Sequence, residues 1–190
     1  KEERHKVLRR KCIMKFYVPR HGEAVWNVHN KICGRTDVEL TEKGHEQAGE
    51  LAERVKDYDI DLIITSPLQR AFETAQTVAN KCRIPLQIDD RLIEQHYGIF
   101  EGKDRQDEGF LANKRQFAYR YPEGGESMMQ MAYRVYGFIE EVKKNYPDKN
   151  VLAVCHGGVC RVIRSYFTDM TNDEFFHYYK ENCQIEEYNL

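Results

Sequence analysis

Val151-Leu152-Ala153-Val154-Cys155-His156-Gly157-Gly158 is the stretch of sequence that decides the fold. Its first five residues form an apolar run with the length and composition of a buried strand. The two glycines let the chain turn at once into a helix, whose apolar positions recur at helical spacing: Val159, Val162, Ile163 and Tyr166. A buried strand followed directly by a helix is the repeating unit of a parallel sheet with helices on its faces.

Four further segments are predicted to be strands of the same sheet. Residues 13–18 and 61–65 are short apolar runs, and residues 86–88 are a weaker one. The tail, at roughly 183–189, is predicted to be an edge strand. Because the strands alternate with helices, we expect an α/β fold, namely a three-layer α/β/α sandwich with a mainly parallel sheet and helices on both faces.

Three further helices are indicated by capping residues at their starts. In chain order these residues are Thr41, Ser66 paired with Gln69, and Ser127 paired with Gln130. Pro67 fits the first position of the second helix, and Pro147 ends the third. Residues 20–40 have no steady period and are predicted to be mostly loop, whereas 89–125 are predicted to be loop with some helix.

The composition indicates one globular domain. The chain has 190 residues, 41% hydrophobic and 32% charged, with a formal net charge of −2. This balance gives no reason to expect nucleic acid or an anionic membrane as a partner, and no apolar run approaches the length of a membrane span. We expect the domain to cover 14–190, with the charged residues 1–13 as a leader or added extension before Met14. The sequence carries no signal for an oligomeric state.

Six cysteines are scattered along the chain without a Cys-x-x-Cys pair. Disulfide frameworks are typical of short secreted chains, and zinc sites of closely paired ligands. We therefore expect reduced thiols, no metal, and a cytoplasmic location.

Chemically reactive residues follow three of the predicted strands. These strand ends carry Arg20-His21, the segment from Ser66 to Arg70, and His156. Ligands of open α/β sheets bind at the carboxyl ends of strands, so two histidines and two arginines are predicted to converge there. Arg70 lies in the first turn of a helix, where the dipole disfavours a cation unless an anion is bound nearby. Gly157 lets the backbone approach such an anion, and the helix that follows offers free N–H groups.

Five motifs in order resemble those of the histidine phosphatase superfamily, also called the phosphoglycerate mutase-like family. They are VPRHGEAVWN (18–27), GRTDVELTEKG (34–44), SPLQRAFET (66–74), EQHYG (94–98) and VCHGGVCR (154–161). Together they cover roughly residues 14 to 165. Pro19 and Ala24 replace more usual residues of the family, and neither replacement removes a catalytic group.

The resemblance implies a catalytic set. His21 would be the nucleophile that forms a phosphohistidine, and surrounding cations would lower its pKa and keep it neutral. Arg20, Arg70 and His156 would bind the phosphoryl oxygens together with the amide of Asn27, and Glu94 would be the general acid. No metal or other cofactor is implied, because the arginines supply the positive charge.

Other residues are assigned less directly by the resemblance. Cys33 and Gly34 fall where relatives touch the substrate beyond the phosphate, and Arg105 either binds a second acidic group or is a solvated loop charge. His96 is expected in the core or at the rim. The remaining histidines of the domain are expected at the surface: His29, His45 and His177.

The leading hypothesis is a phosphatase for a small phosphorylated metabolite. A cofactor-dependent phosphoglycerate mutase or a sugar bisphosphatase is the first alternative, and a silent phosphate-binding module is the second. EQHYG slightly favours a mutase, but the segment 103–121 is short and lacks the proline cluster of a mutase lid. A short lid would leave the phosphoenzyme open to water.

Overall fold

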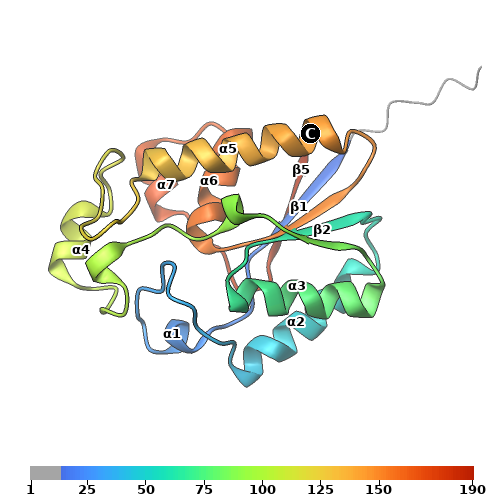
Figure 1. Cartoon of the computed structure of the whole chain (residues 1–190), viewed down its shortest axis with the longest axis horizontal. Coiled ribbons are helices and arrows are strands. Elements are labelled where there is room, and N and C mark those ends of the chain that lie inside the picture. The colour runs from blue at the N-terminus through green and yellow to red at the C-terminus, as the bar shows by residue number, and fades with distance from the viewer. Residues whose placement is uncertain (1–13) are drawn as a thin grey trace, which may run out of the picture.

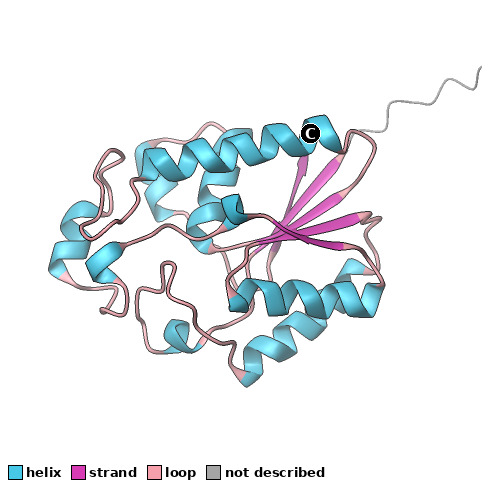
Figure 2. Cartoon of the chain, viewed as in Figure 1, coloured by secondary structure: helices cyan, strands magenta, loops and turns pink. Residues whose placement is uncertain are grey.

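The computed structural model describes residues 14–190 (Figure 1). The predicted leader, 1–13, lies outside the described residues. A five-stranded sheet crosses the centre of the molecule, drawn in magenta in Figure 2, with the strand order β3-β2-β4-β1-β5. The strands are β1 (Lys15–Pro19), β2 (Leu62–Thr65), β3 (Leu86–Ile88), β4 (Val151–Val154) and β5 (Ile185–Asn189). All five predicted strands are confirmed.

The sheet is mainly parallel. β4 pairs in parallel with both β1 and β2, and β2 pairs in parallel with β3. Only β5 runs antiparallel, against β1, so the tail is the edge strand that the sequence predicted. The carboxyl ends of β1, β2 and β4 therefore lie side by side at one end of the sheet.

Helices cover both faces of the sheet, as Figure 1 shows. The helices are α1 (Val25–Val28), α2 (Glu42–Val55), α3 (Gln69–Cys82), α4 (Glu108–Asn113), α5 (Met128–Asn145), α6 (Gly157–Phe167) and α7 (Asn172–His177). Single 3-10 turns lie at Asp90–Leu92 and Gly98–Phe100. The predicted three-layer α/β/α sandwich is confirmed, and none of the helices within 14–190 is long and apolar enough to cross a bilayer.

Successive side chains of each strand point to opposite faces of the sheet, so the core has two halves, one on each face. Tyr17, Ile63 and Leu152 pack against α2 and α3 on one face. Their neighbours Phe16 and Leu62 pack against α5 and α6 on the other. Fully burying one such side chain contributes about 1.5–3 kcal/mol. The two faces together therefore fix the orientation of β1, β2 and β4.

Two of the three predicted helix caps are confirmed. The Thr41 hydroxyl accepts a hydrogen bond from the amide of Gly44, and Ser127 and Gln130 form a reciprocal capping box. The predicted capping box at Ser66 is wrong, because α3 begins two residues later than expected, with Leu68 as its N-cap. The Ser66 hydroxyl lies 2.7 Å from Nε2 of His156 instead, so a contact between strands replaces the local cap.

Candidate active site

A cavity of about 320 Å³ opens at the carboxyl ends of β1, β2 and β4. It is lined by nine of the ten residues that the sequence assigned to the site: Arg20, His21, Asn27, Cys33, Gly34, Arg70, Glu94, Arg105 and Gly157. The tenth, His156, is fully buried, and its ring centroid lies 5.1 Å from that of His21. The predicted convergence is therefore present in the fold.

His21 follows β1 and is held by its own main chain. Its amide donates to the carbonyl of Cys155 at 2.9 Å, which continues the pairing of β1 with β4. Its ring Nδ1 lies 2.6 Å from the carbonyl of Gly22, so Nδ1 carries the proton. The lone pair then resides on Nε2, which is the atom available for nucleophilic attack.

The pKa of His21 is lowered well below its usual value. Burial of the ring is the largest cause, followed by the charges of Arg70 and Arg20. The sequence had suggested the cations as the cause, and they rank second to desolvation. Both effects act in the same direction and keep the imidazole neutral near pH 7.

Two buried guanidinium groups flank the histidines. Arg20 donates through Nη1 to the carbonyl of Lys180 at 2.7 Å, and Arg70 donates to the carbonyls of Thr36 at 3.0 Å and Gly34 at 2.8 Å. Nε of each guanidinium is buried without a partner, and within 14–190 neither has a carboxylate within 4.0 Å. A buried cation without a counter-ion is costly, so the site is arranged to receive an anion.

His156 is the N-cap residue of α6 and lies buried beneath the cavity, next to His21. Its Nε2 contacts the hydroxyl of Ser66, while its Nδ1 is buried without a partner. Its pKa is lowered well below the usual value, by burial first and then by the charges of Arg70 and His21. His156 is therefore a neutral group with one ring nitrogen that has no partner within 14–190.

The carboxylate of Glu94 is held at the start of α6. Oε1 accepts from the amide of Gln95 at 2.9 Å, and Oε2 accepts from the amide of Gly158 at 3.0 Å. A Cβ on residue 158 would lie 2.5 Å from Oε1, so a glycine is required for this close approach. Glu94 is 9% exposed and lines the cavity, so its free edge faces the position of a ligand.

The segment between β1 and α2, which includes α1, supplies the remaining predicted contacts. The Oδ1 atom of Asn27 accepts from the amide of Ala24, and its Nδ2 lies 3.9 Å from the Cys33 sulfur. Burial raises the pKa of the Cys33 thiol, so this residue is a wall of the cavity rather than a second nucleophile. Gly34 has a φ of +54°, a conformation that favours glycine, and presents its carbonyl to Arg70.

Arg105 lies at the outer rim. It is half-buried, and its Nε donates to the carbonyl of Lys31 at 3.1 Å, which leaves the rest of the guanidinium at the cavity. His29, His45 and His177 are at the surface, as predicted, and His96 is half-buried with Nδ1 2.9 Å from the carbonyl of Gly124.

Sequence reasoning missed a segment at the end of the chain. Tyr178, Tyr179 and Lys180 line the cavity, and Nδ2 of Asn182 donates to the carbonyl of His21 at 2.7 Å. This segment belongs to no motif, and the antiparallel return of β5 beside β1 is what brings it to the site. Arg161 and Lys114 also line the cavity, and Arg161 could have been suspected because it ends the motif around His156.

Comparison with known proteins identifies the family of the chain. The family model for the histidine phosphatase superfamily (branch 1) matches residues 16–190. The chain belongs to the histidine phosphatase superfamily. The resemblance seen in the five motifs is thereby confirmed over nearly the whole described chain.

Named relatives include both phosphatases and mutases. The chain is 36% identical over 144 residues to the uncharacterized phosphatase PhoE of Bacillus subtilis, an alignment that covers 76% of this chain and 72% of that protein. It is also 36% identical over 154 residues to the probable phosphoglycerate mutase GpmB of Cronobacter sakazakii, with 76% and 70% covered. These relatives support a phosphatase, with a mutase as the alternative.

The fold has solved counterparts. A mycobacterial glucosyl-3-phosphoglycerate phosphatase, solved as a complex with VO3, superimposes with a TM-score of 0.82 at 26% identity. The match covers 92% of this chain and 90% of that one. The α/β fold predicted from the sequence is therefore that of known phosphatases.

Proposed function

We propose that this protein is a phosphatase that hydrolyses the phosphate monoester of a small metabolite through a phosphohistidine at His21. The observation that carries the proposal is the pair of buried arginines without counter-ions beside a buried, neutral imidazole. The transition state of phosphoryl transfer has three equatorial oxygens, and the positive charge of these arginines would stabilise it.

The proposed reaction has two steps. Nε2 of His21 attacks phosphorus while the bond from phosphorus to the alcohol oxygen breaks, and Glu94 gives its proton to that oxygen. Water then attacks the phosphohistidine, Glu94 takes a proton from the water, and the bond from phosphorus to nitrogen breaks to release inorganic phosphate. Arg20, Arg70 and His156 bind the phosphoryl oxygens, with the amide of Asn27 as a neutral donor.

The outer wall suggests what else the substrate carries. Arg105, Lys114 and Arg161 line the cavity, whereas Glu94 is the one carboxylate among its lining residues within 14–190. We propose that the leaving alcohol bears a second acidic group, which these cations and the main chain of Gly34 and Gly157 would help to bind. An acidic phosphate ester should then have a higher kcat/KM than a neutral one, and Arg105→Gln should narrow that difference.

The proposed setting is a reducing one. Cys33, Cys82, Cys155, Cys160 and Cys183 are free thiols. Cys155 and Cys160 are unbonded although their sulfur atoms are only 3.5 Å apart. The free thiols support the proposal of a cytoplasmic location. We also propose that residues 14–190 act as one catalytic domain.

The covalent intermediate is the direct test of the proposal. Brief incubation with a phosphate ester should leave an acid-labile, base-stable phosphoryl group on the protein, and His21→Ala should abolish both this label and turnover. A variant that lacks the imidazole and still keeps more than a small residue of activity would show that the mechanism is wrong.

A mutase remains the second candidate, because a relative named as a mutase is as similar as one named as a phosphatase. Both activities pass through phosphorylated His21 and differ in whether water or a substrate hydroxyl takes the phosphate. We expect hydrolysis of a phosphate ester to be much faster than interconversion of 3- and 2-phosphoglycerate, even with bisphosphoglycerate as primer. The opposite ranking would favour the mutase and leave the roles of the residues unchanged.

A further inference from the structure

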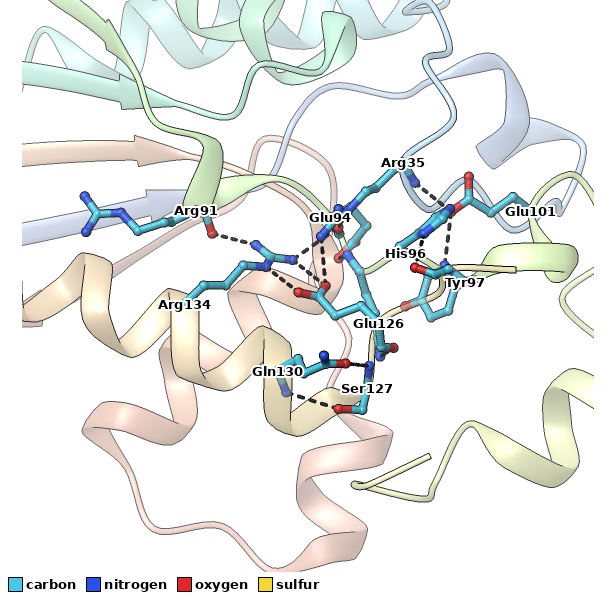
Figure 3. Close-up of polar contacts among 12 residues, drawn as sticks. Arg35, Arg91, Glu94, His96, Tyr97, Glu101, Glu126, Ser127, Gln130 and Arg134 are labelled. Atoms are coloured by element: carbon cyan, nitrogen blue, oxygen red, sulfur yellow. Dashed lines mark hydrogen bonds and ion pairs between the residues drawn. The ribbon is translucent and has the colours of Figure 1, made fainter. Parts of the chain in front are cut away.

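A charged cluster lies behind the segment that carries Glu94 (Figure 3). At its centre the carboxylate of Glu126 binds Arg134 through two contacts, Nε to Oε1 at 2.7 Å and Nη2 to Oε2 at 2.8 Å. Arg35 reaches the same carboxylate from the opposite loop, with Nη2 3.3 Å from Oε2. The carboxylate thus accepts from two guanidinium groups that come from different parts of the chain.

Both guanidinium groups also bind the main chain at Glu94. Nη2 of Arg134 donates to the carbonyl of Glu94 at 3.2 Å, and Nε of Arg35 donates to the same oxygen at 3.3 Å. Nη1 of Arg134 donates to the carbonyl of Arg91 at 2.6 Å, so one planar fork holds the segment at two points. These contacts position the backbone of the proposed acid without touching its carboxylate.

Glu126 is itself fixed in place. Its amide donates to the carbonyl of His96 at 2.8 Å, and its own carbonyl accepts from the side chain of Gln95 at 3.0 Å. The side chains of Glu126 and Arg134 are only 10% and 15% exposed, so their charges are poorly screened by solvent. A mobile surface ion pair would not hold a backbone segment in this way.

We infer that Glu126 is a positioning residue: through Arg134 and Arg35 it holds the main chain of Glu94 so that the carboxylate meets the leaving oxygen of the substrate. The inference rests on the proposed function, in which Glu94 is the general acid. Loss of the negative charge at Glu126 leaves the two guanidinium groups without their common partner and loosens both contacts to the Glu94 carbonyl.

Dependence on the leaving group separates positioning from mere structural support. An alkyl phosphate needs a proton on its departing oxygen, whereas p-nitrophenyl phosphate releases a phenolate that is stable without one. The value of kcat/KM reports the steps up to departure of the alcohol, so a misplaced acid lowers it for the alkyl ester alone. The ratio of the two values does not depend on what fraction of a preparation is folded.

The experiment compares Glu126→Gln and Arg134→Lys with the unchanged protein on both esters. We expect kcat/KM for the alkyl phosphate to fall about 10- to 100-fold, because general acid catalysis contributes about 10²–10⁴-fold and is lost only in part. For p-nitrophenyl phosphate we expect a change of less than about threefold, since the phosphate-binding groups are untouched. Glu141→Gln is the matched control. Glu141 lies in α5, like Arg134, and its substitution removes only an exposed ion pair with Arg91, so both kcat/KM values should stay unchanged.

Glu94→Gln supplies the reference for selectivity. If it shows a large loss confined to the alkyl ester while Glu126→Gln and Arg134→Lys lower both esters equally, the positioning role is wrong and the acid role stands. If Glu94→Gln itself shows no such selectivity, the assignment of Glu94 as the acid fails instead. The two failures are therefore distinguishable.

Discussion

Gly158→Ala should displace Glu94, the proposed general acid, without disturbing the fold. The added Cβ would lie 2.5 Å from Oε1 of Glu94, and ordinary contacts begin at 3.4 Å. The carboxylate must therefore move by about 0.9 Å, the difference between the two distances. A misplacement of about 1 Å can cost about 10²-fold in rate, so we expect kcat/KM for an alkyl phosphate to fall by about that factor. Because the displaced atom ends a flexible side chain, the fold should be retained, since the helix propensity of alanine, about 1 kcal/mol, offsets the weakened hydrogen bonds from the amides of Gln95 and Gly158.

The assay is steady-state hydrolysis of an alkyl phosphate, followed by phosphate release, with thermal unfolding measured on the same samples. Gly137→Ala in α5 is the matched control, because no atom lies within 4 Å of its added Cβ. That variant should gain roughly 0.5–1 kcal/mol of stability and keep full activity. The reasoning would be refuted by a Gly158→Ala protein whose kcat/KM stays within a factor of a few of the unchanged enzyme.

Three further predictions follow from the electrostatics of the site. Arg70→Lys should lower kcat/KM by about 10²–10³-fold and weaken inhibition by inorganic phosphate. The reason is that an ammonium group cannot bind two carbonyls and an anion together, as the planar guanidinium can. Near-normal inhibition by phosphate would contradict this prediction. The pKa values of His21 and His156 are lowered in the fold, so the unfolded chain binds more protons than the folded protein below about pH 6.5. As the pH falls through this range, each histidine should therefore lower the free energy of unfolding by about 1.4 kcal/mol per pH unit. Urea titrations should show that His156→Gln has a shallower decline between about pH 5 and 6.5 than the unchanged protein. EDTA should leave turnover unchanged, since Arg20 and Arg70 supply the positive charge, and a strict requirement for Mg²⁺ or Zn²⁺ would point to a different phosphatase chemistry.

Much of the fold could be predicted because its signals are local. The helix at 128–145 carries a capping box and an apolar face, and both depend only on residues a few positions apart. The sequence also shows where the strands end, and ligands of such sheets bind at the carboxyl ends of strands. His21, Arg70 and His156 could therefore be predicted to share one site. The predicted cap at Ser66 was wrong because a residue distant in the sequence decides it: His156, 90 residues later, competes for the Ser66 hydroxyl.

The parts of the site that could not be predicted depend on contacts without a local pattern. In the sequence, Glu126 is only the residue before the helix cap Ser127. No neighbouring residue indicates that Glu126 binds both Arg134 and Arg35. The side chain of Asn182 acts on a main-chain oxygen 161 residues earlier, and such a contact leaves no spacing to recognise. The antiparallel pairing of β5 with β1 is what brings the side chain of Asn182 to the carbonyl of His21.

That pairing has a consequence for the order of events during synthesis. Arg20 donates to the carbonyl of Lys180, which is made 160 residues later, and the carbonyl of Arg20 accepts from the amide of Cys183. During synthesis, the proposed nucleophile His21 leaves the ribosome long before the segment from Lys180 to Cys183 has been made. On the proposed function, we therefore expect the growing polypeptide to be inactive toward phosphate esters until β5 joins β1.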